Sequence, residues 1–362
     1  MLNVPPPYGG GEIVNQYLAD SLNARYKIVR WSQENATKST QGEFLGMNVF
    51  SSLKKGGLIL RLIFRDRPNV ILIGLGKNLW SYVRDVLFAT VAGLFGMRVI
   101  GDLHGMGFSF LGGSRMETTF LKCTINRFSA IRTLGDEIKS GLQFHGYRGR
   151  VYVIDNGIVP GIQTDFYQPR VRSGPLKLLY LGEISESKGI YRCLNVVASL
   201  KEQEIASYLT VVGEWLNQET RQNVVDAIEA RGLYSSVQVK GRILGKQKWE
   251  LISQQDMLLH LTDWDGQPLS ILETMSIGIP TISTYVGAIP ETISTGINGF
   301  LVRNKLDDSV EILRDIYSGK IDYSSVSRNC FDTFKKRYTV EILSKNVNEM
   351  LEKELNLAVA SK

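Results

Sequence analysis

The chain has 362 residues, a length that is large for one core and suits two domains of about 150 to 200 residues each. Its hydrophobic fraction of 43% and charged fraction of 22% are those of an ordinary soluble globular protein. The strongest uncharged apolar run, residues 86–97, is 12 residues long, which excludes a membrane span of roughly 20 residues and predicts a buried helix.

The net charge of +6 is concentrated in the first half of the chain. Residues 1–165 contain 19 lysines and arginines against 12 acidic residues, whereas residues 166–362 contain 23 against 24. A basic surface attracts nucleic acid, an anionic membrane or a phosphorylated acceptor. No nucleic-acid-binding motif is present, and the basic residues are scattered, so we expect no nucleic-acid partner. A surplus of this size more often serves solubility alone, and peripheral contact with an anionic membrane is the alternative.

The cysteines indicate the compartment. Cys123, Cys193 and Cys330 have no metal-ligand spacing, and a sparse, odd set of cysteines is typical of a reducing environment. The sequence also shows no secretory signal. We therefore expect a cytoplasmic protein, with peripheral attachment to the inner face of the membrane as an open possibility.

The chain starts with a short strand and a glycine-rich loop. Residues 1–4 supply about four strand residues, fewer than the usual 5 to 6, so a few residues upstream of Met1 would complete the strand. Gly9, Gly10 and Gly11 then lead into an amphipathic helix over residues 13–22. Glycines let backbone amides approach a phosphate or sugar closely, although a glycine triplet alone usually means a flexible loop.

Strands and helices alternate along both halves of the chain. Apolar rather than alternating strands predict parallel sheets that are covered on both faces. In the first half we expect strands at 26–31, 69–73, 98–103, 129–133 and 151–154, with helices at 53–64 and 80–95. In the second half we expect strands at 176–181, 207–213, 237–239, 257–261, 281–283 and 296–302, helices at 220–230 and 245–254, and a helical tail over 306–357.

One histidine occupies a position where functional residues are expected. Binding sites of parallel sheets lie at the carboxyl ends of the strands, and His104 directly follows the strand 98–103. A lone histidine is more often structural than chemical. We interpret the other two, His145 beside a turn and His260 within an apolar strand, as structural.

The segment 262–273 carries the clearest chemical signal. It follows the apolar strand 257–261, forms a loop, and enters a helix whose first turn holds Pro268. The amides at such a helix start favour an anion. Asp265 and Glu273, eight residues apart, would repel a phosphate and suit the hydroxyls of a sugar and of a ribose instead.

This segment resembles the donor-site signature of the family 4 retaining glycosyltransferases, in which two glutamates are separated by seven residues. Asp265-Gly266-Gln267-Pro268 and Glu273 are followed by Gly278-Ile279-Pro280 and by Gly287-Ala288-Ile289-Pro290-Glu291, as in that family. Only the first acid departs from the pattern, with aspartate in place of glutamate. The resemblance covers nearly the whole chain and is strongest over residues 176–302.

Several other segments match the same family by position. Gly10 and Gly11 match its first glycine-rich loop, and His104 matches a histidine that contacts the donor sugar or phosphate. Lys188 matches the lysine of a Gly-Arg-x-x-x-x-Lys-Gly segment that clamps the donor diphosphate, but Glu183 stands where its arginine is expected. Arg242 is a candidate substitute for the missing cation, with a surface role about equally expected.

The resemblance implies a GT-B fold, with two Rossmann-like α/β lobes whose parallel sheets face a cleft. It implies an acceptor-binding lobe over residues 1–160, a nucleotide-sugar-binding lobe over 175–340, and a last helix, 341–362, that crosses back to the first lobe. The site residues implied are Lys188, His104 and Asp265 for catalysis, and Gly10, Gly11, Glu183, Arg242, Gly266, Gln267, Pro268, Leu269, Ser270 and Glu273 for donor binding.

The implied activity is that of a hexosyltransferase-type enzyme of bacterial surface polysaccharide assembly. It would move a sugar from a UDP- or GDP-linked donor to a glycan or lipid-diphosphate acceptor, with retention and without a cofactor or essential metal. Asp263-Trp264-Asp265 could suggest a metal-dependent transferase, but it overlaps the donor signature. The alternatives are a nucleotide-sugar epimerase or hydrolase, and a non-catalytic nucleotide-sugar-binding relative. A dehydrogenase is disfavoured because no Gly-x-Gly-x-x-Gly follows a strand.

Overall fold

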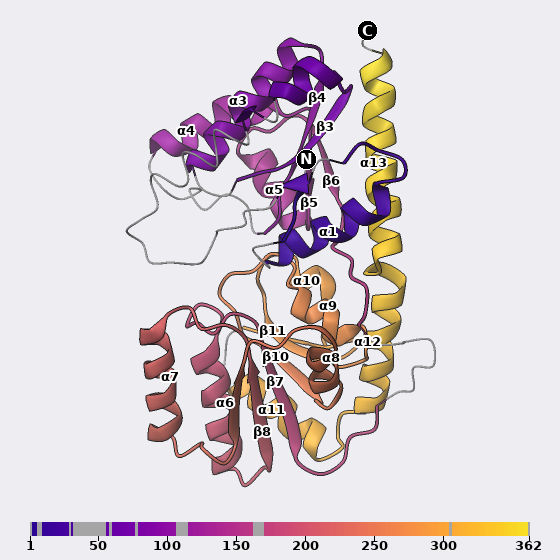
Figure 1. Cartoon of the computed structure of the whole chain (residues 1–362). Coiled ribbons are helices and arrows are strands. Elements are labelled where there is room, and N and C mark those ends of the chain that lie inside the picture. Colours follow the sequence, from indigo (N-terminus) through magenta and orange to yellow (C-terminus); the bar gives the residue numbers. More distant parts are fainter. Residues whose placement is uncertain are drawn as a thin grey trace. The chain divides into compact units, whose positions relative to one another are not determined.

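The chain folds into two compact α/β units in a computed structural model. One unit comprises residues 1–157 with 340–362, and the other comprises residues 158–339. All strand pairs in the described part of the chain are parallel, as the apolar strands predict. The structure describes residues 2–5, 9–28, 30–31, 56–57, 60–76, 79–105, 115–161, 170–303 and 306–360 (Figure 1).

The sheet of the first unit has the order β3-β4-β5-β6 among the described strands. A separate pair, β1 (Leu2–Asn3) and β2 (Arg30–Trp31), is also parallel. The four strands of the larger sheet are β3 (Val70–Gly74), β4 (Arg98–Asp102), β5 (Ala130–Thr133) and β6 (Arg150–Val153).

Two predicted elements of the first unit differ from the structure. The strand expected over 26–31 is described only at β2, because the amides of Arg25 and Tyr26 bond to the carbonyl of Leu22 and continue the end of the preceding helix. Much of the helix expected over 53–64 lies outside the described residues, and its end is a π-helical turn, η1 (Leu62–Asp66).

The last helix belongs to the first unit. α13 packs against α1 and β3, and Glu354 on α13 is fully buried. Its carboxylate accepts hydrogen bonds from Arg98 and from the Tyr152 hydroxyl, both at 2.8 Å. The helical elements of this unit are α1 (Gly10–Leu22), α3 (Leu79–Leu94), α4 (Arg115–Thr124), η2 (Ile125–Arg127), α5 (Asp136–Phe144) and α13 (Val340–Ala360).

The sheet of the second unit has the order β12-β11-β10-β7-β8-β9. Its strands are β7 (Leu176–Leu181), β8 (Ser207–Val212), β9 (Val237–Gly241), β10 (Met257–His260), β11 (Thr281–Thr284) and β12 (Phe300–Val302). Its helices are α6 (Ile190–Glu202), α7 (Gln218–Ala230), α8 (Gly245–Ser253), α9 (Leu269–Met275), α10 (Ile289–Thr292), α11 (Leu306–Tyr317) and α12 (Tyr323–Arg337).

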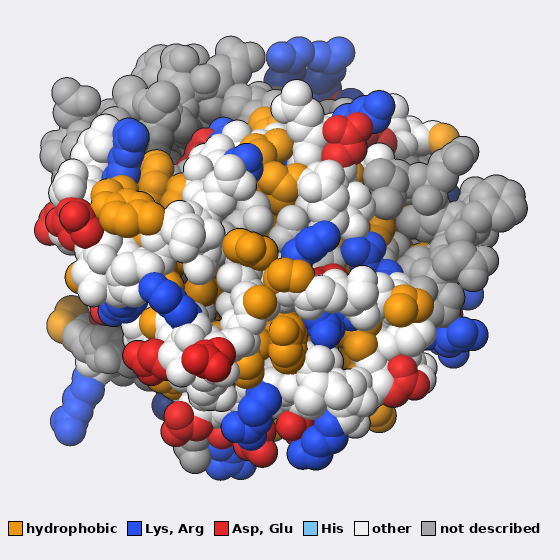
Figure 2. Space-filling view, turned by 90° about the horizontal axis from the view of Figure 1, so that it is seen from below, with side chains coloured by type: hydrophobic (Ala, Val, Ile, Leu, Met, Phe, Trp, Pro, Cys, Tyr) orange, Lys and Arg blue, Asp and Glu red, His pale blue; other side chains and the backbone are white. Residues whose placement is uncertain are grey.

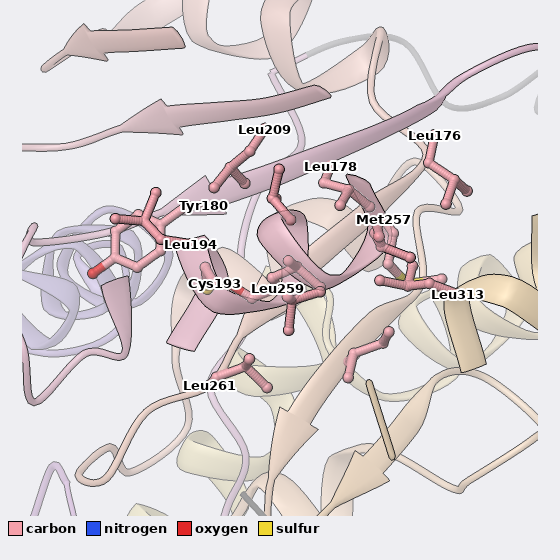
Figure 3. Packing of buried hydrophobic residues seen from close by; sticks show 14 of the residues in the cluster. Leu176, Leu178, Tyr180, Cys193, Leu194, Leu209, Met257, Leu259, Leu261 and Leu313 are labelled. Atoms are coloured by element: carbon pink, nitrogen blue, oxygen red, sulfur yellow. Dashed lines mark hydrogen bonds between the residues drawn. The ribbon is translucent and has the colours of Figure 1, made fainter. Parts of the chain in front are cut away.

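The core of the second unit explains its stable central strands. Apolar side chains of β7, β10, α6 and α11, among them Leu178, Leu194, Leu259 and Leu313, are buried together (Figure 3). Burial of such a side chain contributes about 1.5 to 3 kcal/mol relative to exposure. The packing of these strands therefore fixes the positions at which the loops at their carboxyl ends begin.

Strand order brings two signature loops together. β7 and β10 are neighbours, so the loop after β7 and the loop after β10 leave the same edge of the sheet. Gly189 allows their close contact, since a Cβ there would lie 2.0 Å from the carbonyl oxygen of Leu261. Its φ of 87° is also in the left-handed region, which favours glycine.

The surface carries both signs of charge. Figure 2 shows lysine, arginine and acidic side chains interspersed on the face that it draws, rather than grouped by sign. Among the described helices, none combines the length and the apolarity that crossing a bilayer requires.

Candidate functional site

The strongest candidate site lies where the loops after β7 and β10 meet. The ammonium of Lys188, from the first loop, donates to Oδ2 of Asp265 and to the carbonyl of Trp264, both at 2.7 Å. Nε2 of His260 lies 3.3 Å from the same carboxylate oxygen, without the alignment of a hydrogen bond. Lysine, aspartate and histidine thus form one polar cluster at the carboxyl edge of the sheet.

The cluster keeps the aspartate ionised. Burial by itself would raise the pKa of Asp265, but the His260 ring and the Lys188 ammonium outweigh burial and lower that pKa to about 2. An ionised carboxylate is an acceptor only, which suits the hydroxyls of a sugar. Both side chains of the ion pair keep about a quarter of their surface exposed and remain accessible to a ligand.

The turn into α9 is held by backbone contacts of its glycines. The carbonyl of Gly266 accepts from the amide of Ala288 at 2.8 Å. Gly287 has a φ of 56°, and a Cβ there would lie 2.2 Å from the carbonyl oxygen of Asp265. The segment around Gly287, which is part of the family signature, therefore packs against the backbone of the Asp265 loop and supports it.

The predicted donor-binding residues at the start of α9 have different environments. Pro268 is the N-cap, and Leu269 is buried in the core. The buried amide of Gln267 donates to the Thr292 hydroxyl at 3.2 Å and so contributes to the packing of α10. Ser270 is partly exposed in the first turn. The side chains of Gln267 and Leu269 thus support the loop.

Glu273 lies about one turn into α9, not two turns as its spacing suggests, because the helix begins at Leu269. Its Oε1 lies 2.6 Å from the ammonium of Lys248 on α8. Both side chains are largely buried, at 12% and 18% exposure. Lys248 was not among the residues predicted from the sequence, because it belongs to no motif and its contact with Glu273 exists only in the folded unit.

The described contacts of Glu183 and Arg242 are with residues outside the Lys188 cluster. Glu183 is partly exposed in the loop after β7, and its carbonyl accepts from the Tyr180 hydroxyl at 2.6 Å. Arg242 follows β9 and forms an ion pair with Glu214. β9 is at the edge of the sheet, separated from β10 by β8 and β7.

The first unit contains a second polar cluster, at the carboxyl end of β4. Nε2 of His104 lies 3.0 Å from Oδ2 of Asp102, and the guanidinium of Arg132 on β5 donates to both Asp102 oxygens at 3.1 and 3.2 Å. Asp102 and Arg132 are buried. Burial raises the pKa of Asp102, but Arg132 and His104 outweigh it and hold that pKa well below its usual range.

The predicted glycines border this cluster. Gly10 and Gly11 form the first turn of α1, and a Cβ on Gly11 would contact the His104 ring at 3.5 Å. His104 is mostly buried, and its Nδ1 has no hydrogen-bond partner among the described residues. Asp102 and Arg132 were not among the residues predicted from the sequence. The signals for them were an aspartate two residues before His104 and an arginine inside an apolar strand, where a charged side chain needs a partner.

The two aspartates of the Asp263-Trp264-Asp265 segment each face a cation. Asp263 lies 2.9 Å from the guanidinium of Arg192, and Asp265 pairs with Lys188. In the described part of the chain, no group of three or more histidine, cysteine or acidic side chains has a metal-binding arrangement.

The two α/β units with parallel sheets have a counterpart among solved structures. The chain has the GT-B fold: it superposes on the crystal structure of Anabaena HepE in complex with UDP with a TM-score of 0.73 and 17% sequence identity. The superposition covers 97% of this chain and 98% of HepE.

Sequence similarity then defines the family. Residues 162–330 match the family model described as "Glycosyl transferases group 1", and this part of the chain is a glycosyltransferase group 1 domain. It contains the Lys188–Asp265 cluster and Glu273. The family resemblance inferred from the signature 265–273 is thereby confirmed.

Curated relatives match over a part of their length. WcaL of Escherichia coli (strain K12), described as a colanic acid biosynthesis glycosyltransferase, is 25% identical over 157 residues, which are 39% of this chain and 36% of WcaL. The lipopolysaccharide 1,6-galactosyltransferase of Salmonella typhimurium (strain LT2) is 28% identical over 170 residues, 45% of each chain. The chain thus covers less than half of these relatives.

Proposed function

We propose that this protein is a retaining glycosyltransferase that moves a sugar from a nucleotide-diphosphate sugar to a glycan acceptor in bacterial surface polysaccharide biosynthesis. The observation that carries this proposal is the Lys188–Asp265 ion pair at the meeting of the β7 and β10 loops, inside the group 1 domain. A cation for the diphosphate and a carboxylate for sugar hydroxyls lie side by side there.

The donor would be held by three side chains of the second unit. Glu273 accepts hydrogen bonds from the ribose hydroxyls, and Asp265 accepts them from the sugar. Lys188 stabilises the leaving diphosphate, on which negative charge grows in the transition state. We assign this role to the lysine rather than to helix amides, because α9 is only 7 residues long. HepE binds UDP, which supports a UDP-linked donor.

The acceptor would be a lipid-linked glycan, and His104 would steady the donor sugar or phosphate. Support comes from the relatives, whose names refer to colanic acid and lipopolysaccharide. The Asp102–His104 contact fixes the ring of His104 for such a role. The basic first half of the sequence supports attachment of this cytoplasmic enzyme to the inner membrane face.

We propose that transfer needs no metal ion. The aspartates of an Asp-x-Asp segment would have to be available as metal ligands, but Asp263 faces Arg192 and Asp265 pairs with Lys188. A cation already present on each carboxylate disfavours a second one. Lys188 supplies the positive charge that a metal supplies in metal-dependent transferases.

Two experiments test the proposal. Thermal shift with UDP, GDP and their sugars identifies the donor, since a ligand at 100 times its dissociation constant stabilises by about 2.7 kcal/mol. Product analysis with the stabilising donor then separates transfer to a glycan from hydrolysis or epimerisation without an acceptor. Nucleotide binding without turnover would favour the binding-only alternative, which the acidic Glu183 supports, and no stabilisation by any nucleotide would refute the donor site.

A further inference from the structure

One helix of the first unit presents an apolar face to solvent. On α3, Trp80, Leu87 and Leu94 are 84%, 59% and 81% exposed. They are seven residues apart, so successive members lie two turns apart on the same side of the helix. Large apolar side chains are rarely exposed in such a row without a binding role. We call Trp80, Leu87 and Leu94 the α3 stripe.

The exposed side of α3 is also free of exposed charge. Between residues 79 and 94 the charged side chains are Arg84 and Asp85, which form an ion pair of 2.8 Å with each other. Their side chains are mostly buried, and Asp85 also accepts from the amide of Gly76 at 2.7 Å. The exposed side of α3 is therefore not a charged, solvated helix face.

An aromatic pair next to arginines lies at the carboxyl end of α3. Phe64 on η1 contacts Phe95, which directly follows α3, with ring centroids 5.2 Å apart, and both are more than half exposed. Arg61, Arg65 and Arg67 surround Phe64 in the sequence and are exposed. The acidic residue among them, Asp66, pairs with Lys27 at 2.9 Å.

We propose that the α3 stripe, with Phe64 and Phe95, inserts into the interface of an anionic lipid bilayer while the arginines bind its headgroups. A row of tryptophan and leucine side chains that leads to phenylalanines flanked by exposed arginines has the composition of interfacial membrane-binding surfaces. The exposed charges beside this pair are Arg61, Arg65 and Arg67, and the one acidic residue among them, Asp66, already pairs with Lys27, so the surface complements anionic lipid. A second copy of this chain would instead bring the same positive surplus.

This inference rests on the proposed function for its purpose, which is to hold the enzyme where a lipid-linked acceptor is found. Lipid binding itself requires neither donor nor transfer. The two can therefore fail separately: vesicle binding tests the surface, and transfer to a water-soluble acceptor analogue tests the catalytic site.

The experiment measures cosedimentation of the full chain with vesicles. Phosphatidylcholine alone is compared with a mixture containing about one third phosphatidylglycerol. The double variant Leu87→Gln with Leu94→Gln should lower the partition coefficient at least about tenfold, because it removes apolar area that the bilayer would bury. Arg61→Gln and Arg65→Gln should each cost about fivefold, and only with the anionic vesicles at low salt.

Phe144→Gln is the matched control, because Phe144 on α5 is 82% exposed but lies outside the α3 stripe. It should bind vesicles like the parent, and all variants should keep the parent's melting temperature. No binding of the parent to anionic vesicles at low salt would overturn the inference. So would equal losses in Phe144→Gln, or self-association in ultracentrifugation that only the α3 stripe variants abolish, which would assign the face to a second copy.

Discussion

The ammonium of Lys188 and the carboxylate of Asp265 lie 2.7 Å apart, so the cation expected to meet the donor diphosphate is paired before any donor arrives. The same ammonium also donates to the carbonyl of Trp264. A diphosphate must therefore compete with Asp265 for this cation. Competition of this kind makes the lysine more valuable in the transition state, where the phosphate charge is largest, than in the ground state.

Replacing Lys188 should affect turnover more than donor binding. Removing one preorganised donor to a developing charge commonly costs about 100- to 1,000-fold in rate. We expect Lys188→Ala to lower kcat by about this factor while raising the KM for the donor far less. Steady-state kinetics with varied donor concentration at saturating acceptor measure both constants.

Arg242→Ala is the control for Lys188→Ala, because Arg242 is also a loop cation of the second unit but pairs with Glu214. Its kcat should stay within a few-fold of the parent. If Lys188→Ala keeps parental turnover and Arg242→Ala loses it, the diphosphate contact belongs to Arg242. Glu183→Arg, which restores the family's cation, should tighten binding of the free nucleoside diphosphate.

Glu273→Gln should weaken nucleotide binding at least about tenfold. Charge-assisted hydrogen bonds are worth roughly 1.5 to 3 kcal/mol, and the substitution keeps the shape of the side chain while removing its charge. It also leaves Lys248 without its partner at 2.6 Å, so part of the loss reflects that unpaired ammonium. Calorimetric titration with UDP and GDP gives the affinities.

The control for Glu273 is Glu250→Gln, since Glu250 on α8 is exposed and pairs with Lys246 one turn earlier. Its nucleotide affinity should equal that of the parent. Unchanged affinity in Glu273→Gln would place the ribose elsewhere in the second unit.

The sequence predicted the strands of both sheets and the loops at their carboxyl ends, because apolar runs and glycines act locally. It also placed Lys188 and Asp265 in one site through the family signature. The two partners could not be predicted for different reasons. Lys248 on α8 meets Glu273 on α9 only in the folded unit, and the contact of His260 with Asp265, five residues later, depends on the course of the loop after β10. His260 was interpreted as structural, and its buried ring lies beside the Asp265 carboxylate.

The pKa of Asp265 predicts a specific pH dependence of stability. Its folded-state pKa of about 2 lies below the ordinary 3.8, so the unfolded chain binds the proton more tightly. The ionised carboxylate therefore contributes about 2 kcal/mol that is fully present above pH 3.8 and is lost as the pH falls through about 2. Asp265→Asn should destabilise the protein by that amount near neutral pH.

The measurement for Asp265 is urea unfolding of the parent and the asparagine variant between about pH 6 and pH 2.5. The difference between the two proteins should shrink over the acidic part of this range. A constant difference at all pH values would mean that the carboxylate charge is not what stabilises the loop.

The buried acid of the last helix predicts a large and local loss of stability. Glu354 on α13 is 0% exposed, lies 2.6 Å from Arg98 and also accepts from the Tyr152 hydroxyl. Removing one partner of a buried ion pair leaves an uncompensated charge and typically costs 3 to 5 kcal/mol, so Glu354→Gln should destabilise the first unit by about that amount. Glu352→Gln, two residues earlier, is the matched control: Glu352 is 41% exposed and pairs with Arg25 at the surface, where a salt bridge is worth about 0 to 1 kcal/mol.

Hydrogen exchange separates the two units, and we expect faster exchange of β4 and β6 amides in Glu354→Gln while β7 and β10 exchange as in the parent. Similar stability of the two variants would show that the Arg98 and Tyr152 contacts do not hold α13 in place.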